Sequence, residues 1–281
     1  MNFKKLKKPY LIGEIGINHN GDLQLAKKLI DAAYSTSWDS VKFQKRNPDV
    51  AVPEHQKSVI RDTPWGKMTY LEYKYRVEFE KKEYDYIDKY CKEKPIEWSA
   101  SVWDMDSLNF LLKYKVPYVK IASALMTNHE LLIETCKTGI PILVSTGMSS
   151  LKEVDEAVNI LEKYSKSYAL MHTNSSYPAR PEDLNLSLIP YYIDRYKCAV
   201  GYSGHELGLT PTVIAVSLGA NIIERHITID RNLWGTDQSS SVEIEGMDSL
   251  QKRLKEVSLI LGKPEKIVTE SEIPIRKKLR G

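Results

Sequence analysis

The chain has 281 residues, of which 42% are hydrophobic and 27% are charged, and its formal net charge is +3. This composition is typical of a soluble globular protein rather than a disordered one, and the small charge, with Lys and Arg spread along the chain, argues against a nucleic-acid-binding protein. The three cysteines are widely spaced, which argues against a disulfide framework or a cysteine zinc site. With no signal peptide and no apolar run of membrane-spanning length, we expect a cytoplasmic protein without a membrane partner.

Short apolar runs alternate with segments of helical period from one end of the chain to the other. The runs are continuously apolar rather than alternating, as is typical of parallel strands buried on both faces. Eight such runs predict strands at residues 10–17, 40–44, 96–102, 118–123, 141–146, 168–173, 199–203 and 221–228.

The segments between the strands carry helix signals. Ser150 and Glu153 predict a capping box at the start of one helix. Thr210 followed by Pro211 predicts an N-cap and the first helical position of another. We expect the last helix to run from about residue 248 to a glycine stop at residue 262.

Eight strand–helix pairs predict either a closed barrel or an open doubly wound α/β sheet. The count of eight, the chain length and the even spacing favour a (β/α)8 TIM barrel, which typically takes about 250 residues. We place this single domain at residues 1–262 and a charged tail at residues 263–281. Residues 45–76 are long and turn-rich, and we interpret them as a loop that covers substrate at the C-terminal face of the barrel.

Polar side chains gather at the C-terminal ends of the predicted strands, where active sites form in this fold. Lys42 and Lys120 lie on two core strands, where an unpaired charge costs several kcal/mol. Either they form structural ion pairs with Glu14 or Glu224, or they bind an anion between them. Hydroxyl groups at further strand ends favour a pocket for phosphate and carboxylate groups. These hydroxyls belong to Ser123, Ser145, Ser175 and Ser203.

Two histidines, His205 and His226, end neighbouring predicted strands, and imidazole suits a divalent transition metal. With Glu14 and Asp237 expected nearby, a metal site is favoured over two structural histidines. Two protein ligands leave positions for water and substrate, as catalysis requires. Glu14 and Glu224 are candidates for acid–base work or for orienting metal-bound water, and an ion pair with a basic residue is their structural alternative.

Six short segments stand one per strand end, in a fixed order between Glu14 and Asp237. They are Glu14-Ile-Gly-Ile-Asn-His-Asn-Gly21, Val41-Lys-Phe-Gln44, Lys120-Ile-Ala-Ser123, Ser145-Thr-Gly-Met148, Ser203-Gly-His205 and Glu224-Arg-His226. Each segment alone is a weak signal. Together they resemble the signature segments of the sialic acid (N-acetylneuraminate) synthase family.

The resemblance implies an N-acetylneuraminate synthase-like transferase of carbohydrate and surface-polysaccharide biosynthesis. Such enzymes condense phosphoenolpyruvate with an aldose or N-acylhexosamine aldehyde, make a 3-deoxy-2-ulosonic acid and release phosphate by C–O cleavage. The expected partners are therefore these two small molecules, in a homo-oligomer that is commonly a dimer.

The resemblance also implies roles for individual residues. His205 and His226 would hold a divalent metal, most often Mn2+, with Mg2+ or Co2+ as alternatives, and Glu14 would lie near metal-bound water. The acceptor sugar would face Gln44, Tyr177 and Asp237. Phosphoenolpyruvate would be held by Lys42, Lys120, Ser123, Ser145, Ser175 and Ser203.

Three features depart from the family pattern. Leu125 stands where the family commonly has a carboxylate, two residues after the serine of the Lys120 segment. Ser99-Ala100-Ser101 stands where relatives often carry Ser-Thr-Pro, so the ligand role of its two serines is uncertain. The usual small C-terminal domain, which resembles type III antifreeze protein and supplies an arginine to the partner's acceptor site, is not expected here. We therefore expect residues 45–76, with Arg61 or Arg76, to complete the acceptor site.

Two alternatives remain open at this point. One is a neighbouring condensing barrel that makes a deoxyoctulosonate or deoxyheptulosonate from a phosphorylated aldose, although such a site should carry more arginines near the barrel mouth. The other is a non-catalytic sugar-binding barrel, which would not need His205, His226, Lys42 and Lys120 together.

Overall fold

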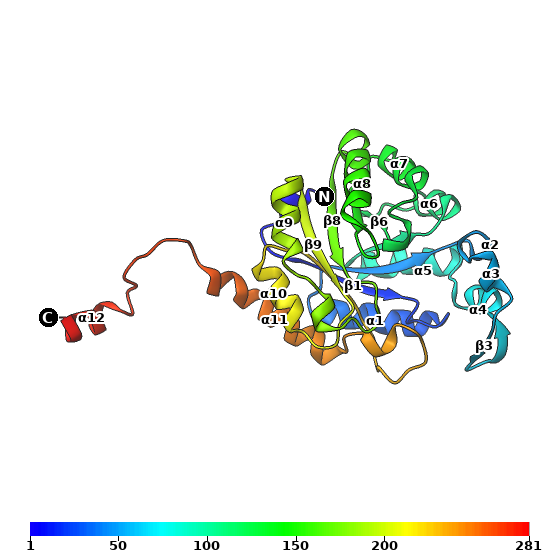
Figure 1. Ribbon diagram of the computed structural model, residues 1–281. Coiled ribbons are helices and arrows are strands. Elements are labelled where there is room, and N and C mark those ends of the chain that lie inside the picture. The colour runs from blue at the N-terminus through cyan, green and yellow to red at the C-terminus, as the bar shows by residue number, and fades with distance from the viewer. Residues whose placement is uncertain (281) are drawn as a thin grey trace.

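The apolar runs form the eight parallel strands of a closed barrel in the computed structural model, which describes residues 1–280 (Figure 1). Around the barrel the strands follow the order β1-β10-β9-β8-β7-β6-β5-β2. Their bounds are β1 (Tyr10–Gly16), β2 (Ser40–Lys45), β5 (Glu97–Val102), β6 (Val119–Ile121), β7 (Ile142–Ser145), β8 (Tyr168–Thr173), β9 (Ala199–Gly204) and β10 (Ile222–His226). The predicted TIM barrel is confirmed, with every strand within three residues of its expected ends.

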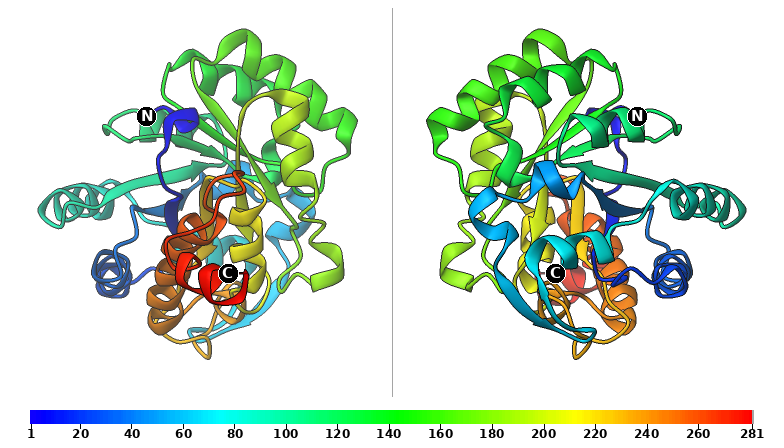
Figure 2. Two further views of the ribbon diagram at one scale, coloured as in Figure 1. Left: turned by 90° about the vertical axis from the view of Figure 1, so that its left-hand side faces the viewer. Right: turned by 90° about the vertical axis from the view of Figure 1, so that its right-hand side faces the viewer.

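One long helix follows each barrel strand and packs on the outside of the barrel, burying an apolar stripe against it (Figure 2). The capping box of Ser150 and Glu153 is formed at the start of α8. These helices are α1 (Leu23–Ser35), α5 (Lys81–Glu93), α6 (Met105–Leu111), α7 (His129–Lys137), α8 (Leu151–Tyr164), α9 (Leu188–Tyr196), α10 (Thr210–Ser217) and α11 (Ile244–Leu261).

Two helix starts differ from the sequence-based expectation. Thr210 is the first residue of α10 rather than its cap, because Leu209 holds the cap position and its carbonyl accepts the first helical hydrogen bond. Helix α11 begins at Ile244, about four residues early, because the carbonyl of Glu243 already accepts the amide of Met247. The helix ends at Leu261, and Gly262 caps it in the left-handed region, where a glycine is favoured.

Inside the barrel an apolar floor lies directly below a polar layer. Side chains alternate across a strand, so every second residue points inward. The floor is a buried cluster that the N-terminal 3-10 helix η1 (Phe3–Lys5) closes with Phe3. Two residues further along, the same strands carry polar groups, in the pairs Ile12 and Glu14, Tyr118 and Lys120, Leu143 and Ser145, Met171 and Thr173, and Ile222 and Glu224. The strand period of two thus places the functional groups in one ring above the core.

The segment after β2 is folded rather than an irregular loop, and it lies at the C-terminal ends of the strands (Figure 2). Its hairpin turns at Gly66, which adopts a positive φ of 102°. Tyr73 and Val77 anchor the segment against Ile17 in a small buried cluster with Trp65 and Trp234 packed on it. The elements are α2 (Pro48–Ala51), α3 (Glu54–Lys57), β3 (Ile60–Thr63), β4 (Gly66–Thr69) and α4 (Tyr70–Val77).

The tail after α11 leaves the barrel on the side away from this segment (Figure 1). It is exposed throughout residues 263–280 and ends in α12 (Ile273–Arg280). The remaining short elements are the 3-10 helices η2 (Ser123–Leu125), η3 (Pro181–Asp183) and η4 (Gln238–Ser240). None of the helices within residues 1–280 combines the length and the hydrophobicity that crossing a membrane requires.

Candidate active site at the strand ends

Two adjoining cavities open at the C-terminal ends of the barrel strands. The inner cavity, of about 190 Å³, lies on the barrel axis, and the outer one, of about 780 Å³, lies between the strand ends and the segment after β2. Gln44, Trp103, Ala124 and Tyr177 line both cavities, so these residues stand at the junction.

The predicted site residues converge on these two cavities. Asp237 lines the outer cavity, and all the other predicted site residues line the inner one. Those on the inner cavity are Glu14, Lys42, Gln44, Lys120, Ser123, Ser145, Ser175, Tyr177, Ser203, His205, Glu224 and His226. Residues from seven of the eight strand ends, and from the loops that follow them, are thus brought to one place.

Both buried lysines are paired with carboxylates, as the structural alternative anticipated. Lys42 Nζ lies 2.6 Å from Glu14 Oε2 and donates to Ser101 Oγ at 2.7 Å. Lys120 Nζ donates to both carboxylate oxygens of Glu224, at 2.8 Å each. Two ammonium groups and two carboxylates sum to zero, so the pairing removes the cost of burying charge. It also means that an incoming anion needs a further positive charge in this cavity.

Glu224 is held ionised by this arrangement. Burial alone would raise the pKa of its carboxyl, but the charges of Lys120 and Lys42 outweigh burial and lower the pKa to about 2. Ser203 Oγ adds a hydrogen bond to Glu224 Oε1 at 3.1 Å, since strand register pairs these two residues across β9 and β10. Glu224 is therefore a fixed negative charge that orients Lys120.

His205 and His226 form a pair of imidazoles beside the ion pairs, with ring centroids 5.6 Å apart. Nδ1 of His205 lies 2.6 Å from the carbonyl oxygen of Asn174, which can only accept, so Nδ1 carries the proton. The Nε2 lone pair then faces the cavity, where it accepts from the hydroxyl of Tyr177 at 2.9 Å. Burial and the neighbouring His226 lower the pKa of His205 to about 3, so the ring is neutral.

The histidine pair fits a divalent metal. A neutral imidazole whose other nitrogen donates to a backbone carbonyl is the usual arrangement around a metal ligand. Nδ1 of His226 is buried without a hydrogen-bond partner and lies 3.9 Å from Asp237 Oδ2. Among the described residues no three His, Cys, Asp or Glu side chains gather closely enough to form a complete ligand set. The two histidines would therefore supply part of a coordination shell that water and substrate complete.

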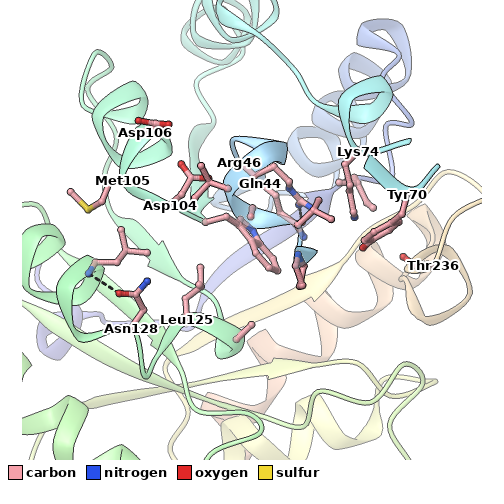
Figure 3. Close-up of a pocket in the computed structure, with 18 of the residues that line it drawn as sticks. Gln44, Arg46, Tyr70, Lys74, Asp104, Met105, Asp106, Leu125, Asn128 and Thr236 are labelled. Carbon is pink, nitrogen blue, oxygen red and sulfur yellow. Dashed lines mark hydrogen bonds between the residues drawn. The ribbon is translucent and has the colours of Figure 1, made fainter. Parts of the chain in front are cut away.

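The outer cavity has an apolar side and a charged side. Leu125 lines it together with Val50 and Val52, and Asn128 faces them from the start of α7. Neither Arg61 nor Arg76 contributes, contrary to the expectation, because their guanidinium groups stack on Tyr70 and Trp65. The cationic lining comes from Arg46 and Lys74 instead (Figure 3).

Lys74 is the functional candidate that sequence reasoning missed. Tyr70, Tyr73, Lys74 and Val77 stand at i, i+3, i+4 and i+7 of α4, which is the spacing of a buried helix face. A lysine at a core position of such a stripe is unusual, because lysine is almost never fully buried without a partner. The sequence alone shows this lysine at a core position, once residues 70–77 are taken as a helix.

Several neighbouring polar residues serve the fold instead. Ser99 donates to the carbonyl of Tyr118 and does not line the cavity, whereas Ser101, two residues further along β5, does. His19 stacks on Phe79 at 3.8 Å and accepts the amide of Gly21. Asn18, His172 and Arg225 likewise hold loops and helices in place through buried hydrogen bonds.

Comparison with known proteins gives consistent matches along the chain. A family model described as the NeuB family matches residues 29–266. The N-acetylneuraminate-9-phosphate synthase of Drosophila melanogaster is 40% identical over 86% of this chain and 66% of its own length. The N,N'-diacetyllegionaminic acid synthase of Legionella pneumophila is 34% identical over 96% of this chain and 78% of its own. The chain thus spans about two thirds to three quarters of these two curated relatives.

A solved structure matches over nearly the whole of both chains. The N-acetylneuraminic acid (sialic acid) synthetase of Leptospira borgpetersenii, determined in complex with citrate, superposes with a TM-score of 0.87 at 32% identity. The match covers 98% of this chain and 93% of the Leptospira chain.

Proposed function

The chain belongs to the NeuB family, and on that premise we propose that it condenses phosphoenolpyruvate with a sugar aldehyde to give a sialic-acid-like 3-deoxy-2-ulosonic acid. The observation that carries this proposal is the inner cavity, where two buried lysines and five serines surround a space beside the paired imidazoles of His205 and His226. The relatives' names point to different acceptors, so the acceptor of this chain is left open among N-acylated hexosamines, their phosphate esters and di-N-acetylated hexoses.

Phosphoenolpyruvate binds in the inner cavity. Each ammonium group has three N–H donors, and Lys120 Nζ directs its hydrogen bonds to Glu224 alone among the described residues, so one donor is left for an anion. The hydroxyls of Ser123, Ser145 and Ser175 supply further donors around the same cavity. The charges of Lys42 and Lys120 stabilise the phosphate group throughout the reaction.

His205 and His226 would hold a divalent metal, since imidazole suits divalent transition ions. The family resemblance favours Mn2+ among them. A metal bound there supplies Lewis-acid polarisation of the aldehyde and the positive charge that the balanced ion pairs lack. Gln44 and Tyr177 stand at the junction of the cavities and orient the acceptor, and Asp237 faces it from the outer cavity.

The reaction forms one C–C bond and, with water, one C–O bond, and it breaks the C–O bond to phosphate. C3 of phosphoenolpyruvate attacks the aldehyde carbon, whose oxygen takes up a proton and becomes a hydroxyl, and the carbon left cationic at C2 takes up a water molecule. Glu14 accepts the proton of that water, since its carboxylate lines the inner cavity beside Lys42. The tetrahedral carbon then expels phosphate, which Lys42 and Lys120 hold as it leaves.

Phosphate release from phosphoenolpyruvate tests the proposal directly. The purified chain is incubated with phosphoenolpyruvate and a panel of hexosamines and aldoses, free and phosphorylated, with and without Mn2+. We expect acceptor-dependent and metal-dependent release. Release with none of the acceptors would reject the proposed function, and release only with a phosphopentose or phosphotetrose would indicate a deoxyoctulosonate- or deoxyheptulosonate-type synthase instead.

A further inference from the structure

The outer cavity contains a buried cation without a partner. Lys74 is 8% exposed and extends from α4 into the cavity (Figure 3). Among residues 1–280 its ammonium group has no ion pair and no hydrogen bond, and it lies 5.0 and 5.3 Å from the ring centroids of Tyr70 and Tyr73. Lys74 Nζ is not among the fully buried unpaired atoms, so the ammonium group reaches the open cavity and is free to pair with a bound anion.

Arg46 is a second buried cation on the same side of this cavity. It is 4% exposed, its guanidinium group stacks 4.8 Å from the ring centroid of Trp103, and its Nη2 donates to Gln44 Oε1. Its Nε lies 3.5 Å from Glu78 Oε2, but Glu78 is also paired with Lys45, at 3.1 Å. Lys45 is also paired with the exposed Glu80, at 3.4 Å. Glu78 and Glu80 therefore balance Lys45 and Arg46, and Lys74 adds a further positive charge.

The carboxylates that line the outer cavity do not neutralise this excess. Asp104 accepts from the amides of Asn47 and Ser107, and Asp106 accepts from the side chain of Asn47, so both are engaged on the far side from Lys74 (Figure 3). Asp237 lies 3.9 Å from His226 Nδ1, and it attracts the charge of Lys74, as Glu78 does, without forming an ion pair with it. Glu130, the remaining carboxylate on the lining, forms no ion pair with Lys74 within residues 1–280 either. The ammonium group of Lys74 is thus left without an ion-paired carboxylate on the same cavity as Arg46.

We propose that Arg46 and Lys74 bind a phosphate ester on the acceptor, so that the enzyme acts on a phosphorylated sugar aldehyde. The proposal rests on the proposed function, since it specifies the acceptor. A guanidinium fork and an ammonium point charge together suit a dianion with three oxygens better than a single carboxylate. Arg46 follows Gln44 by two residues and is hydrogen-bonded to it, so an acceptor with its aldehyde end at Gln44 and Tyr177 has its far end at the two cations.

The test compares acceptors that differ only in the phosphate group. N-acetylmannosamine and its 6-phosphate are the first pair, and N-acetylglucosamine, mannose and arabinose are used free and as terminal phosphates. The value of kcat/KM is measured for each with saturating phosphoenolpyruvate and Mn2+. We expect at least a tenfold preference for the phosphate ester of one pair, as the loss of charge-assisted hydrogen bonds implies.

Variants locate the preference. Lys74→Met and Arg46→Met should each lower the ratio of kcat/KM for the ester over the free sugar at least tenfold, and Lys74→Arg should retain most of it. Lys67→Met is the matched control, because Lys67 is exposed on β4, in the same segment after β2, and lines neither cavity; it should leave the ratio unchanged. Melting temperatures of all variants check that each is folded.

Binding is measured separately, so that turnover is not required for a decision. Calorimetry on the full chain with Mn2+ but without phosphoenolpyruvate should give tighter binding of the ester than of the free sugar, and Lys74→Met should abolish the difference. Suppose that phosphate is released with free or di-N-acetylated sugars, and that no ester has an advantage in kcat/KM or in binding. This result would overturn the inference while the proposed function stands. If no acceptor supports release, the proposed function fails, and the calorimetry alone decides whether Arg46 and Lys74 bind a phosphate ester.

Discussion

Lys120 Nζ lies 2.8 Å from each carboxylate oxygen of Glu224, and both side chains are buried inside the barrel. The pair joins β6 to β10 across the barrel axis, and Lys42 approaches the same carboxylate at 3.7 Å. Lys120, which we propose to bind phosphoenolpyruvate, is thus positioned by the carboxylate of Glu224. Mutation can separate the proposed binding role of Lys120 from the stability that its ion pair with Glu224 provides.

We predict that Glu224→Gln destabilises the protein, because it leaves the Lys120 ammonium buried without a counter-charge. Breaking a buried pair costs about 3–5 kcal/mol, which urea denaturation would measure as a lower free energy of unfolding. Replacing both partners, as in Lys120→Met with Glu224→Gln, should recover most of that loss but leave the KM for phosphoenolpyruvate raised. Full stability in Glu224→Gln alone would show that Lys120 is neutral in the folded protein.

We predict that His205→Ala abolishes turnover and lowers bound metal, since it removes one of two imidazole ligands. Metal content is measured after dialysis, alongside phosphate release. His129→Ala is the matched control, because His129 is exposed at the start of α7 and its side chain lines neither cavity, and it should change neither quantity. Turnover that survives chelation of the wild-type protein would exclude the metal from the reaction.

The barrel was predictable because its strands are continuous apolar runs. Burial on both faces forces that composition, and the eight runs could be counted without knowing any contact. Helix starts, such as those at Thr210 and Ile244, were predicted less accurately, because shifting a helix start by a few residues changes the apolar pattern of the sequence very little.

The site was predictable to the extent that it depends on strand ends. Glu14 and Lys120 stand two residues after floor residues, so the strand period alone brings them into one ring. The acceptor side was predicted less well, because it depends on how residues 46–77 fold over the barrel. Arg61 and Arg76 stack on the partly buried rings of Tyr70 and Trp65, while Lys74 lines the cavity. Short helices and a hairpin decide which way each of these side chains points.

We predict that Leu125→Glu shifts acceptor preference toward N-acetylmannosamine. Leu125 lines the outer cavity, where the family commonly places a carboxylate, and a carboxylate there would accept hydrogen bonds from sugar hydroxyls. The shift is measured as the change in relative kcat/KM across the acceptor panel. Leu125→Gln is the control, because glutamine has the size of glutamate without its charge. If the wild-type protein and both variants show the same relative kcat/KM across the acceptors, this position does not contact the acceptor.

The acceptor KM should rise with pH through the titration of Lys74. Burial, then the charge of Arg46, lower the pKa of Lys74 to about 7, with Arg61 acting in the same direction and Asp237 and Glu78 opposing it. Below pH 7 the ammonium is protonated and binds a phosphate ester, and above it the neutral amine loses that attraction. We therefore expect the KM for an ester acceptor, measured from pH 6 to pH 9, to increase on the alkaline side of about pH 7. The bound ester raises the lysine pKa, so the KM for a free sugar should show little of this step. In Lys74→Arg the guanidinium stays charged throughout, so the step should vanish from the ester profile; an unchanged profile would assign the titration to another group.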